Sequence, residues 1–255
     1  MTIIDGIILG IIQGVTEFLP ISSSGHLVIA QELLGIKQPG NQFEILVHMG
    51  TLASIIVVFF DDIRFLFLSI NKKGTQKFIS YIIIGTIPAV LLGLGFKDTL
   101  ESLFENTYYV GCALIFTGII LFISNNVKRM EKDNSYHKSF LIGIAQALAI
   151  IPGISRSGMT ISCALLLGLS AKESARFSFL LAIPVIFGAG LLMALDIDDG
   201  LQIEPAVALA GLISSFIIGI IALKWLLDLL QDGKLHYFGV YCFSIGTLTF
   251  FYKWI

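Results

Sequence analysis

Six long apolar stretches, separated by short polar segments, constrain this chain more than any other feature of its sequence. They lie near residues 43–60, 78–96, 108–125, 175–195, 204–225 and 236–254. Each is long enough, or nearly so, to cross the apolar core of a bilayer, which takes about 17–25 residues. Composition agrees, because 56% of the 255 residues are hydrophobic and only 13% are charged, against about 25% charged in soluble domains. The sequence therefore predicts an all-α polytopic membrane protein with six transmembrane helices.

Two further apolar regions, 2–35 and 139–170, are interrupted in the middle by proline, glycine and serine. Each half is about a dozen residues, which is too short to span a bilayer. We therefore expect two re-entrant helix-turn-helix regions that enter the membrane and return. Irregular backbone at this depth is stable only where it is buried in protein or lines a polar cavity.

The charges of the connecting segments predict the orientation. Segments 61–77 and 126–138 are rich in lysine and arginine, whereas 97–107 and 196–204 are mainly acidic. Basic segments stay on the cytoplasmic side, so both termini are expected outside the cytoplasm. The net charge of −2 gives no electrostatic reason to expect nucleic-acid binding. Membrane lipids are the expected surroundings.

The two broken regions resemble one another in sequence. Residues 10–25 and 143–158 align at one constant offset in their Gly, Gln, Ile, Ser, Ser and Gly positions. We therefore divide the single membrane domain, 1–255, into repeats over 1–130 and 135–255. Each repeat has one broken region and three spans, and the odd number of spans inverts the second repeat. In such inverted-topology repeats, broken helices meet near the bilayer midplane and form the site.

The first break concentrates polar groups at membrane depth. Gln13 and Glu17 are four residues apart and so share one helix face, and three serines (22–24) and His26 follow. A serine could simply cap the returning helix. Capping does not explain Glu17 and His26, because an intramembrane carboxylate needs a cation, a proton or a polar cavity to offset its cost.

The second break carries Arg156, the only charged residue between Lys138 and Lys172. Hydroxyl groups, glycines and the free N–H groups of a helix start surround it, which favours an anion site that matches phosphate oxygens. The alternative is a purely structural ion pair between Arg156 and Glu17.

These motifs resemble the membrane undecaprenyl-diphosphatases of the bacitracin-resistance type over essentially the whole chain. The resemblance rests on the pair Gln13 and Glu17, on the motifs of residues 22–26 and 152–160, and on segments 43–51 and 176–184. Many members have glutamate where this chain has Gln13, which weakens the case for a two-carboxylate metal site. The resemblance implies hydrolysis of undecaprenyl diphosphate to undecaprenyl phosphate, which recycles the lipid carrier for cell-wall synthesis.

The resemblance also implies roles for individual residues. The residues expected to be catalytic are Glu17, Ser23, His26 and Arg156. The residues expected to bind phosphate are Ser22, Ser24, Gly153, Ser155, Ser157 and Thr160. Ser23 is the candidate nucleophile with His26 as its base, and Glu17 would orient His26 or, with Gln13, hold a weakly bound divalent cation, Mg²⁺ or Ca²⁺. The sequence does not decide between attack by serine and attack by a metal-activated water.

Several alternatives stay open at this point. Inverted repeats are also typical of transporters, so a lipid flippase or secondary transporter is the rival function. Glu44 and His48, four residues apart, could line the cavity or lie at the membrane interface, and Arg176 is expected to be a cytoplasmic anchor. The partners are a polyprenyl diphosphate and membrane lipids, and the sequence leaves open whether the chain forms a homodimer.

Overall fold

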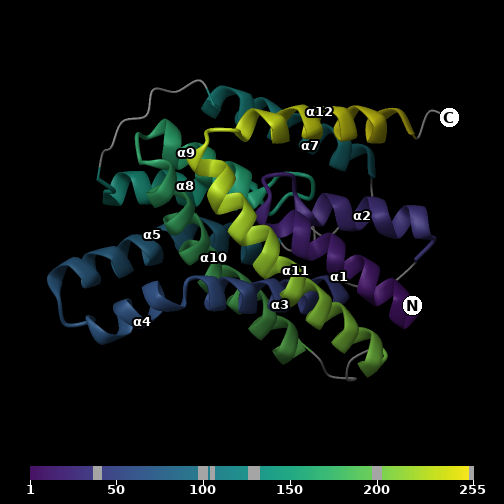
Figure 1. The fold of residues 1–255 in the computed structure, drawn as a ribbon, viewed down its shortest axis with the longest axis horizontal. Coiled ribbons are helices and arrows are strands. Elements are labelled where there is room, and N and C mark those ends of the chain that lie inside the picture. Colours follow the sequence, from purple (N-terminus) through teal and green to yellow (C-terminus); the bar gives the residue numbers. More distant parts are fainter. Residues whose placement is uncertain (37–41, 97–102, 104–106, 126–132, 197–202, 253–255) are drawn as a thin grey trace.

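The computed structural model describes residues 1–36, 42–96, 103, 107–125, 133–196 and 203–252, and its regular elements in these ranges are all helices. They are α1 (Ile3–Phe18), α2 (Ser23–Leu34), α3 (Gln42–Val58), α4 (Phe60–Leu68), α5 (Lys73–Gly95), α7 (Thr107–Asn125), α8 (Tyr136–Leu148), α9 (Arg156–Leu166), α10 (Ala171–Asp196), α11 (Pro205–Gln231) and α12 (Leu235–Tyr252). Figure 1 shows them as one helical assembly.

Every apolar stretch predicted to span the membrane is mainly helical over the residues that the structure describes. Four helices, α5, α7, α10 and α11, are long and apolar enough to cross a bilayer singly, and α3 with α4 makes a fifth, bent candidate. Helix α12 is apolar but shorter. Large apolar side chains face outward, such as Leu91 and Ile221, which are 68% and 60% exposed. Such surfaces are stable against lipid, so the chain is a multi-pass membrane protein.

Segment 61–77, expected as a polar connection, contains the helix α4. Helix α4 is bent by 69° from α3 and leaves Phe60, Phe67 and Leu68 exposed. Its sequence is still apolar between the charged positions, so a helix that satisfies its own backbone is favoured over an irregular loop. The basic residues Lys72, Lys73 and Lys77 follow this helix.

Both broken regions fold as a helix, a turn and a second helix, as predicted. Helix α1 starts at a capping box, in which the Thr2 hydroxyl accepts from the Asp5 amide and the Asp5 carboxylate accepts from the Thr2 amide. It ends at Phe18, just before Pro20. Helix α8 ends before Pro152 in the same way. Proline removes an amide donor from the ladder, which explains both breaks.

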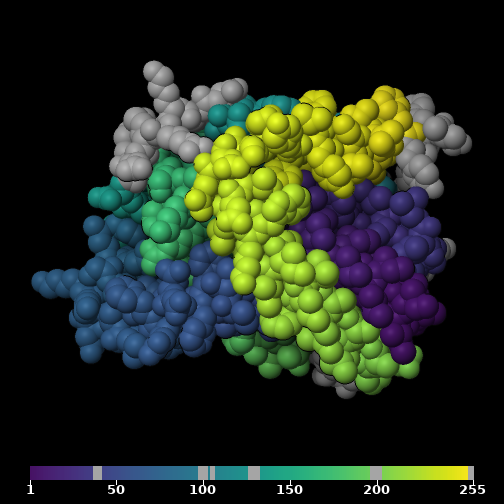
Figure 2. Space-filling view, in the orientation of Figure 1, coloured from purple at the N-terminus to yellow at the C-terminus, as the bar shows by residue number. Residues whose placement is uncertain are grey.

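The first helix of each broken region packs on a long helix of the other half of the chain. Helix α1 lies along α11 and α8 lies along α5, while α7 pairs with α12 and α3 packs on both α10 and α11. Helices α11 and α12 cover much of the face in Figure 2, with α1 and α2 beside them. A core around Phe18, Phe179 and Leu223 lies next to the first turn and supports it from one side.

A candidate active site where the two turns meet

The second helix of each broken region starts with the same cap. The Ser22 hydroxyl accepts from the Gly25 amide at 3.3 Å, and the Ser155 hydroxyl accepts from the Gly158 amide at 3.1 Å. Each cap satisfies one amide, and the other amides at the start of α2 and α9 have no helical carbonyl to bond. Both helices therefore present a positive N-terminus at their turns.

The two turns are in direct contact. The Ser157 hydroxyl donates to the Leu19 carbonyl at 3.3 Å, and a Cβ atom at Gly25 would lie 3.0 Å from the Gly153 Cα. Gly153 has φ +94°, a conformation that favours glycine, and the Thr117 hydroxyl donates to its carbonyl at 3.0 Å. Figure 1 shows both turns together in the middle of the molecule, beneath α7 and α12.

Glu17 is the centre of the polar contacts at this junction. Its Oε2 accepts from the Ser23 hydroxyl at 2.6 Å and from the Gln13 amide Nε2 at 3.1 Å, and its Oε1 pairs with Arg156 Nη2. The residue is only 6% exposed. The structure thus brings together four predicted site residues from α1, α2 and α9, and it satisfies a buried carboxylate with donors and a cation.

His48 is a site residue that the sequence interpretation left open. Its Nε2 lies 3.3 Å from Glu17 Oε2, and its Nδ1 donates to the Glu44 carbonyl at 2.6 Å. Both ring nitrogens of His48 therefore face hydrogen-bond acceptors. The available sequence signal was a histidine inside an apolar span, one helical turn after Glu44. Its Glu17 contact could not be inferred from that spacing.

Two buried polar atoms beside Glu17 have no hydrogen-bond partner among the residues that the structure describes. One is Arg156 Nη1, a donor, and the other is Gln13 Oε1, an acceptor. The Arg156 guanidinium also lies over the Phe179 ring, 6.0 Å from its centroid. Buried groups of this kind are rarely left unsatisfied. Nη1 therefore has the character of an anion-binding donor, and Gln13 Oε1 that of a cation-binding or water-binding acceptor.

His26 belongs to a different set of contacts. Its Nδ1 donates to the Ser22 carbonyl at 2.8 Å, and its Nε2 lies 2.9 Å from the Tyr241 hydroxyl, with the two rings stacked at 5.6 Å between centroids. In a neutral ring Nε2 is then the acceptor and Tyr241 the donor. The hydroxyl of Ser23 points to Glu17, so the ring nitrogens of His26 and the Ser23 hydroxyl have separate partners in this structure.

Most of the other predicted phosphate-binding residues line the same turns. Ser22 has φ +70°, the only positive φ of a non-glycine residue in the described ranges, which is a strain typical of functional turns. The hydroxyls of Ser22 and Ser24 lie 3.4 Å apart, and those of Ser155 and Ser157 lie 3.3 Å apart. Thr160 is directed away from this pair, because its hydroxyl contacts Ser178 on α10 at 2.6 Å.

The donor set for a metal is small. The described residues include no group of three or more histidine, cysteine, aspartate or glutamate side chains that could hold a metal ion. Gln13 Oε1 is free to accept, and Glu17 supplies one carboxylate. Hard divalent cations take six or more oxygen ligands, so this pair fits a weakly bound ion whose remaining ligands are water and substrate.

Known proteins resemble this chain over almost its whole length. The model of the family described as bacitracin resistance protein BacA matches residues 6–248. An undecaprenyl-diphosphatase of Halothermothrix orenii is 43% identical over 253 residues, which cover 97% of each chain. One from Methanosphaera stadtmanae is 40% identical, covering 98% of this chain and 97% of its own. Undecaprenyl-diphosphatase 3 of Bacillus anthracis is also 40% identical, with 97% and 96% covered.

Proposed function

Since the chain belongs to the bacitracin resistance protein BacA family, we propose that it hydrolyses undecaprenyl diphosphate to undecaprenyl phosphate and inorganic phosphate. This activity returns the lipid carrier to cell-wall synthesis, and it confers bacitracin resistance by consuming the diphosphate form of the lipid. The substrate is a polyprenyl diphosphate that the enzyme takes from the surrounding membrane.

The observation that carries this proposal is Arg156 Nη1, which is buried and has no hydrogen-bond partner among the described residues. It lies beside Glu17, the carboxylate that accepts a hydrogen bond from the Ser23 hydroxyl. A guanidinium donates through several N–H groups, and here Nη2 pairs with Glu17 while Nη1 is free for a phosphate oxygen. The N-termini of α2 and α9 add backbone donors from both turns. A diphosphate bound there has its terminal phosphorus close to Ser23.

The hydrogen bonds favour a covalent route. Ser23 Oγ attacks the terminal phosphorus and forms an O–P bond, the bridging P–O bond breaks, and undecaprenyl phosphate leaves. The serine proton passes to Glu17 Oε2, which already accepts a hydrogen bond from Ser23 Oγ at 2.6 Å. Water then cleaves the phosphoserine and releases phosphate. Arg156 and the helix N-termini hold the negative charge of the transferring group throughout.

His26 and Gln13 have supporting roles. His26 Nε2 is held by Tyr241 and becomes available to protonate the leaving phosphate or to accept a proton from water once the Tyr241 hydroxyl is displaced. Gln13 Oε1 and Glu17 are the residues that would hold a divalent cation, Mg²⁺ or Ca²⁺. When bound, such a cation neutralises charge on the diphosphate oxygens.

The test is a trapping experiment with purified protein in detergent. Undecaprenyl diphosphate labelled with ³²P at the terminal phosphate is mixed with enzyme in a single turnover and quenched in denaturant. We expect label on the wild-type protein, none on Ser23→Ala, and loss of turnover in Ser23→Ala with little change in substrate binding. Turnover at the wild-type rate by Ser23→Ala would reject the serine route in favour of a metal-activated water, and no phosphate release by the wild type would reject the function.

We further infer that the fold is an inverted repeat in an inner membrane, with units 1–130 and 135–255, six spans and two re-entrant regions. The reciprocal packing supports this, because α1 lies on α11 as α8 lies on α5. Such reciprocity is what a pseudo-two-fold relation between the two halves requires. The charge pattern supports termini outside the cytoplasm. A homodimer is compatible with this arrangement, and cross-linking in native membranes would test it.

A further inference from the structure

Helix α12 contacts the first broken region through two consecutive residues. The Tyr241 hydroxyl lies 2.9 Å from His26 Nε2, and the two rings are stacked with 12° between their planes. The Cys242 thiol donates to the Pro20 carbonyl at 3.6 Å, and Cys242 is fully buried. A helix from the end of the chain is therefore attached to the first turn, and Tyr241 is the residue that it brings to a site side chain.

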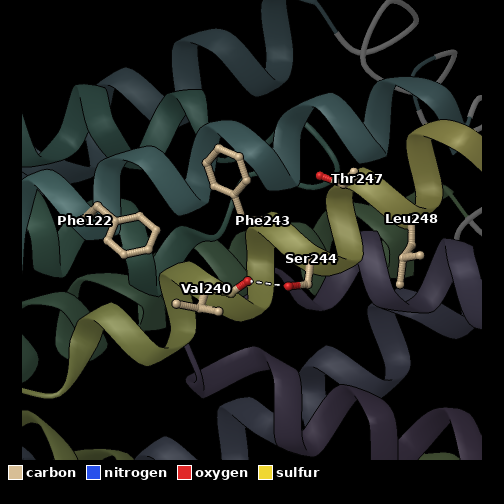
Figure 3. Close-up of a pocket in the computed structure, with 6 residues that line it drawn as sticks. All are labelled: Phe122, Val240, Phe243, Ser244, Thr247 and Leu248. Atoms are coloured by element: carbon tan, nitrogen blue, oxygen red, sulfur yellow. Dashed lines mark hydrogen bonds between the residues drawn. The ribbon is translucent and has the colours of Figure 1, made fainter.

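Helix α12 is closely packed against α7. A Cβ atom at Gly111 would lie 2.9 Å from the Gly246 carbonyl oxygen. One at Gly118 would lie 3.0 Å from the Gly239 carbonyl oxygen. The two backbones therefore approach more closely than larger side chains would allow. Figure 3 shows Phe243 of α12 pointing toward α7. A packed helix pair of this kind holds the tyrosine at one place, which an irregular segment would not.

The contacts of His26 determine where its ring carries a proton. Its Nδ1 lies 2.8 Å from the Ser22 carbonyl oxygen, which can only accept, so Nδ1 is the protonated nitrogen. In the neutral ring Nε2 then has a lone pair, and the Tyr241 hydroxyl donates to it. Such a ring can take up a proton at Nε2 and has none to give there. The contact therefore favours a base that accepts a proton from water over an acid for the leaving phosphate.

We propose that Tyr241 is a positioning residue for the hydrolysis of the phosphoserine. It acts through His26, because its ring sets the plane of the imidazole by stacking and its hydroxyl keeps Nε2 the nitrogen without a proton. The same hydroxyl then orients the hydrolytic water beside Nε2. The inference rests on the proposed function, since it concerns the second step of that reaction.

In this step a water molecule enters the hydrogen bond between Tyr241 and His26. The hydroxyl now donates to the water oxygen, and the water donates to Nε2. The water attacks the phosphorus on Ser23, a new O–P bond forms, and the water proton passes to Nε2. The Oγ–P bond breaks, and Oγ takes back the proton that Glu17 received in the first step. Inorganic phosphate leaves, and the imidazolium returns its proton to solvent.

The first measurement follows the second step directly. Enzyme in detergent is mixed with undecaprenyl diphosphate labelled with ³²P at the terminal phosphate, chased with excess unlabelled substrate, and quenched in denaturant at intervals. The appearance of protein-bound label measures attack by Ser23, and its decay measures hydrolysis of the phosphoserine.

Three variants and one control are compared with the wild type. Tyr241→Phe keeps the stacked ring and removes the hydroxyl, His26→Gln removes the proposed base, and the third variant combines both changes. The matched control is Tyr237→Phe, because Tyr237 lies one helical turn earlier on α12 and is 62% exposed.

We expect label to decay about five-fold more slowly in Tyr241→Phe, the effect of one neutral hydrogen bond, and about 10²-fold more slowly in His26→Gln. Label should appear at the wild-type rate in both, and Tyr237→Phe should match the wild type throughout. The double variant should decay no more slowly than His26→Gln, because Tyr241 acts through His26. Wild-type decay in Tyr241→Phe, an equal slowing of appearance and decay, or a further slowing in the double variant would each overturn the proposal.

The second measurement does not depend on turnover. Protein labelled with ¹⁵N in its histidine rings is reconstituted in lipid vesicles and studied by solid-state NMR, and the His26 signals are assigned by their loss in His26→Gln. We expect a proton on Nδ1 and none on Nε2 in the wild type. The Nε2 signal should shift in Tyr241→Phe, where this nitrogen loses its donor, and stay in place in Tyr237→Phe. A wild-type ring with its proton on Nε2, or an Nε2 signal unchanged by Tyr241→Phe, would overturn the proposal.

The two proposals fail separately. Absence of phosphate release by the wild type would refute the hydrolase function, and the NMR measurement would still show whether the Tyr241 hydroxyl holds His26 Nε2. Phosphate release without any protein-bound label would keep the hydrolase function and overturn the role of Tyr241 in phosphoserine hydrolysis.

Discussion

Replacing Arg156 by lysine keeps the positive charge and removes the geometry on which the proposed site depends. In the structure one guanidinium nitrogen pairs with Glu17 while Nη1 is buried and unpartnered. A lysine has a single ammonium nitrogen on a flexible stem and cannot hold Glu17 and a phosphate oxygen in the same fixed arrangement. Arg156→Lys should therefore lose one preorganised donor to the transferring phosphate.

The expected cost is about 10²–10³ in kcat, or about 2.7–4 kcal/mol, the value of one such donor in a water-excluded site. Phosphate release from undecaprenyl diphosphate in detergent measures it. Thermal unfolding should stay near that of the wild type for Arg156→Lys, whereas Arg156→Met should lose about 3–5 kcal/mol because Glu17 stays buried with one cation fewer.

The matched control is Arg176→Lys. Arg176 also pairs with a carboxylate, Asp62 at 2.6 Å, but both side chains are partly exposed, at 24% and 34%. A partly exposed pair that keeps its charge should change activity by less than about three-fold. Retention of a third or more of the activity by Arg156→Lys, or an equal loss in Arg176→Lys, would refute the argument that Arg156 holds Glu17 and a phosphate oxygen at once.

Three further predictions address the surroundings of the site. His48→Ala should lower kcat by about 10²-fold and His48→Gln by only about ten-fold, because the glutamine amide can still donate to Glu17; equal losses in a kcat measurement would contradict this role. Gln13→Glu should tighten Mg²⁺ binding in calorimetry, since it adds a second carboxylate, and an unchanged or weaker affinity would argue against the metal position. In a background without the native cysteines, a membrane-impermeant thiol reagent on intact cells should label Glu204→Cys and not His137→Cys; the reverse pattern would invert the orientation.

The helical segments were predictable from the sequence because their signals are local. Runs of apolar residues gave the six long segments, and Pro20 and Pro152 gave the breaks. The ends were less predictable: α5 starts at Lys73 and α11 runs to Gln231, beyond the apolar runs, because a helix can continue past the bilayer core into water. Helix α4 was not predicted, because its charged residues interrupt the apolar run that would have indicated a helix.

The site was predictable to the extent that it depends on charge at membrane depth. Glu17 and Arg156 stood out because an intramembrane charge requires a partner or a function, and the structure pairs them. The contact between Tyr241 and His26 joins residues 215 apart in sequence, and nothing near Tyr241 distinguishes it from a lipid-facing tyrosine. Contacts of this kind follow from the crossing of α2 and α12, which no local pattern records.

The pairing of Arg156 with Glu17 was open to two interpretations, a structural bridge or an anion site, and the geometry makes them compatible. In the structure, Glu17 has Arg156 and His48 beside it, which suits a buried carboxylate and leaves both of its oxygens occupied. A phosphate that draws the guanidinium toward itself leaves Glu17 with less positive charge nearby and readier to accept the proton of Ser23. Arg156 would thus couple binding of the diphosphate to activation of the nucleophile. This coupling requires that loss of Arg156 depress the phosphorylation of Ser23 more than it depresses substrate affinity, which the ³²P trapping experiment on Arg156→Lys can resolve.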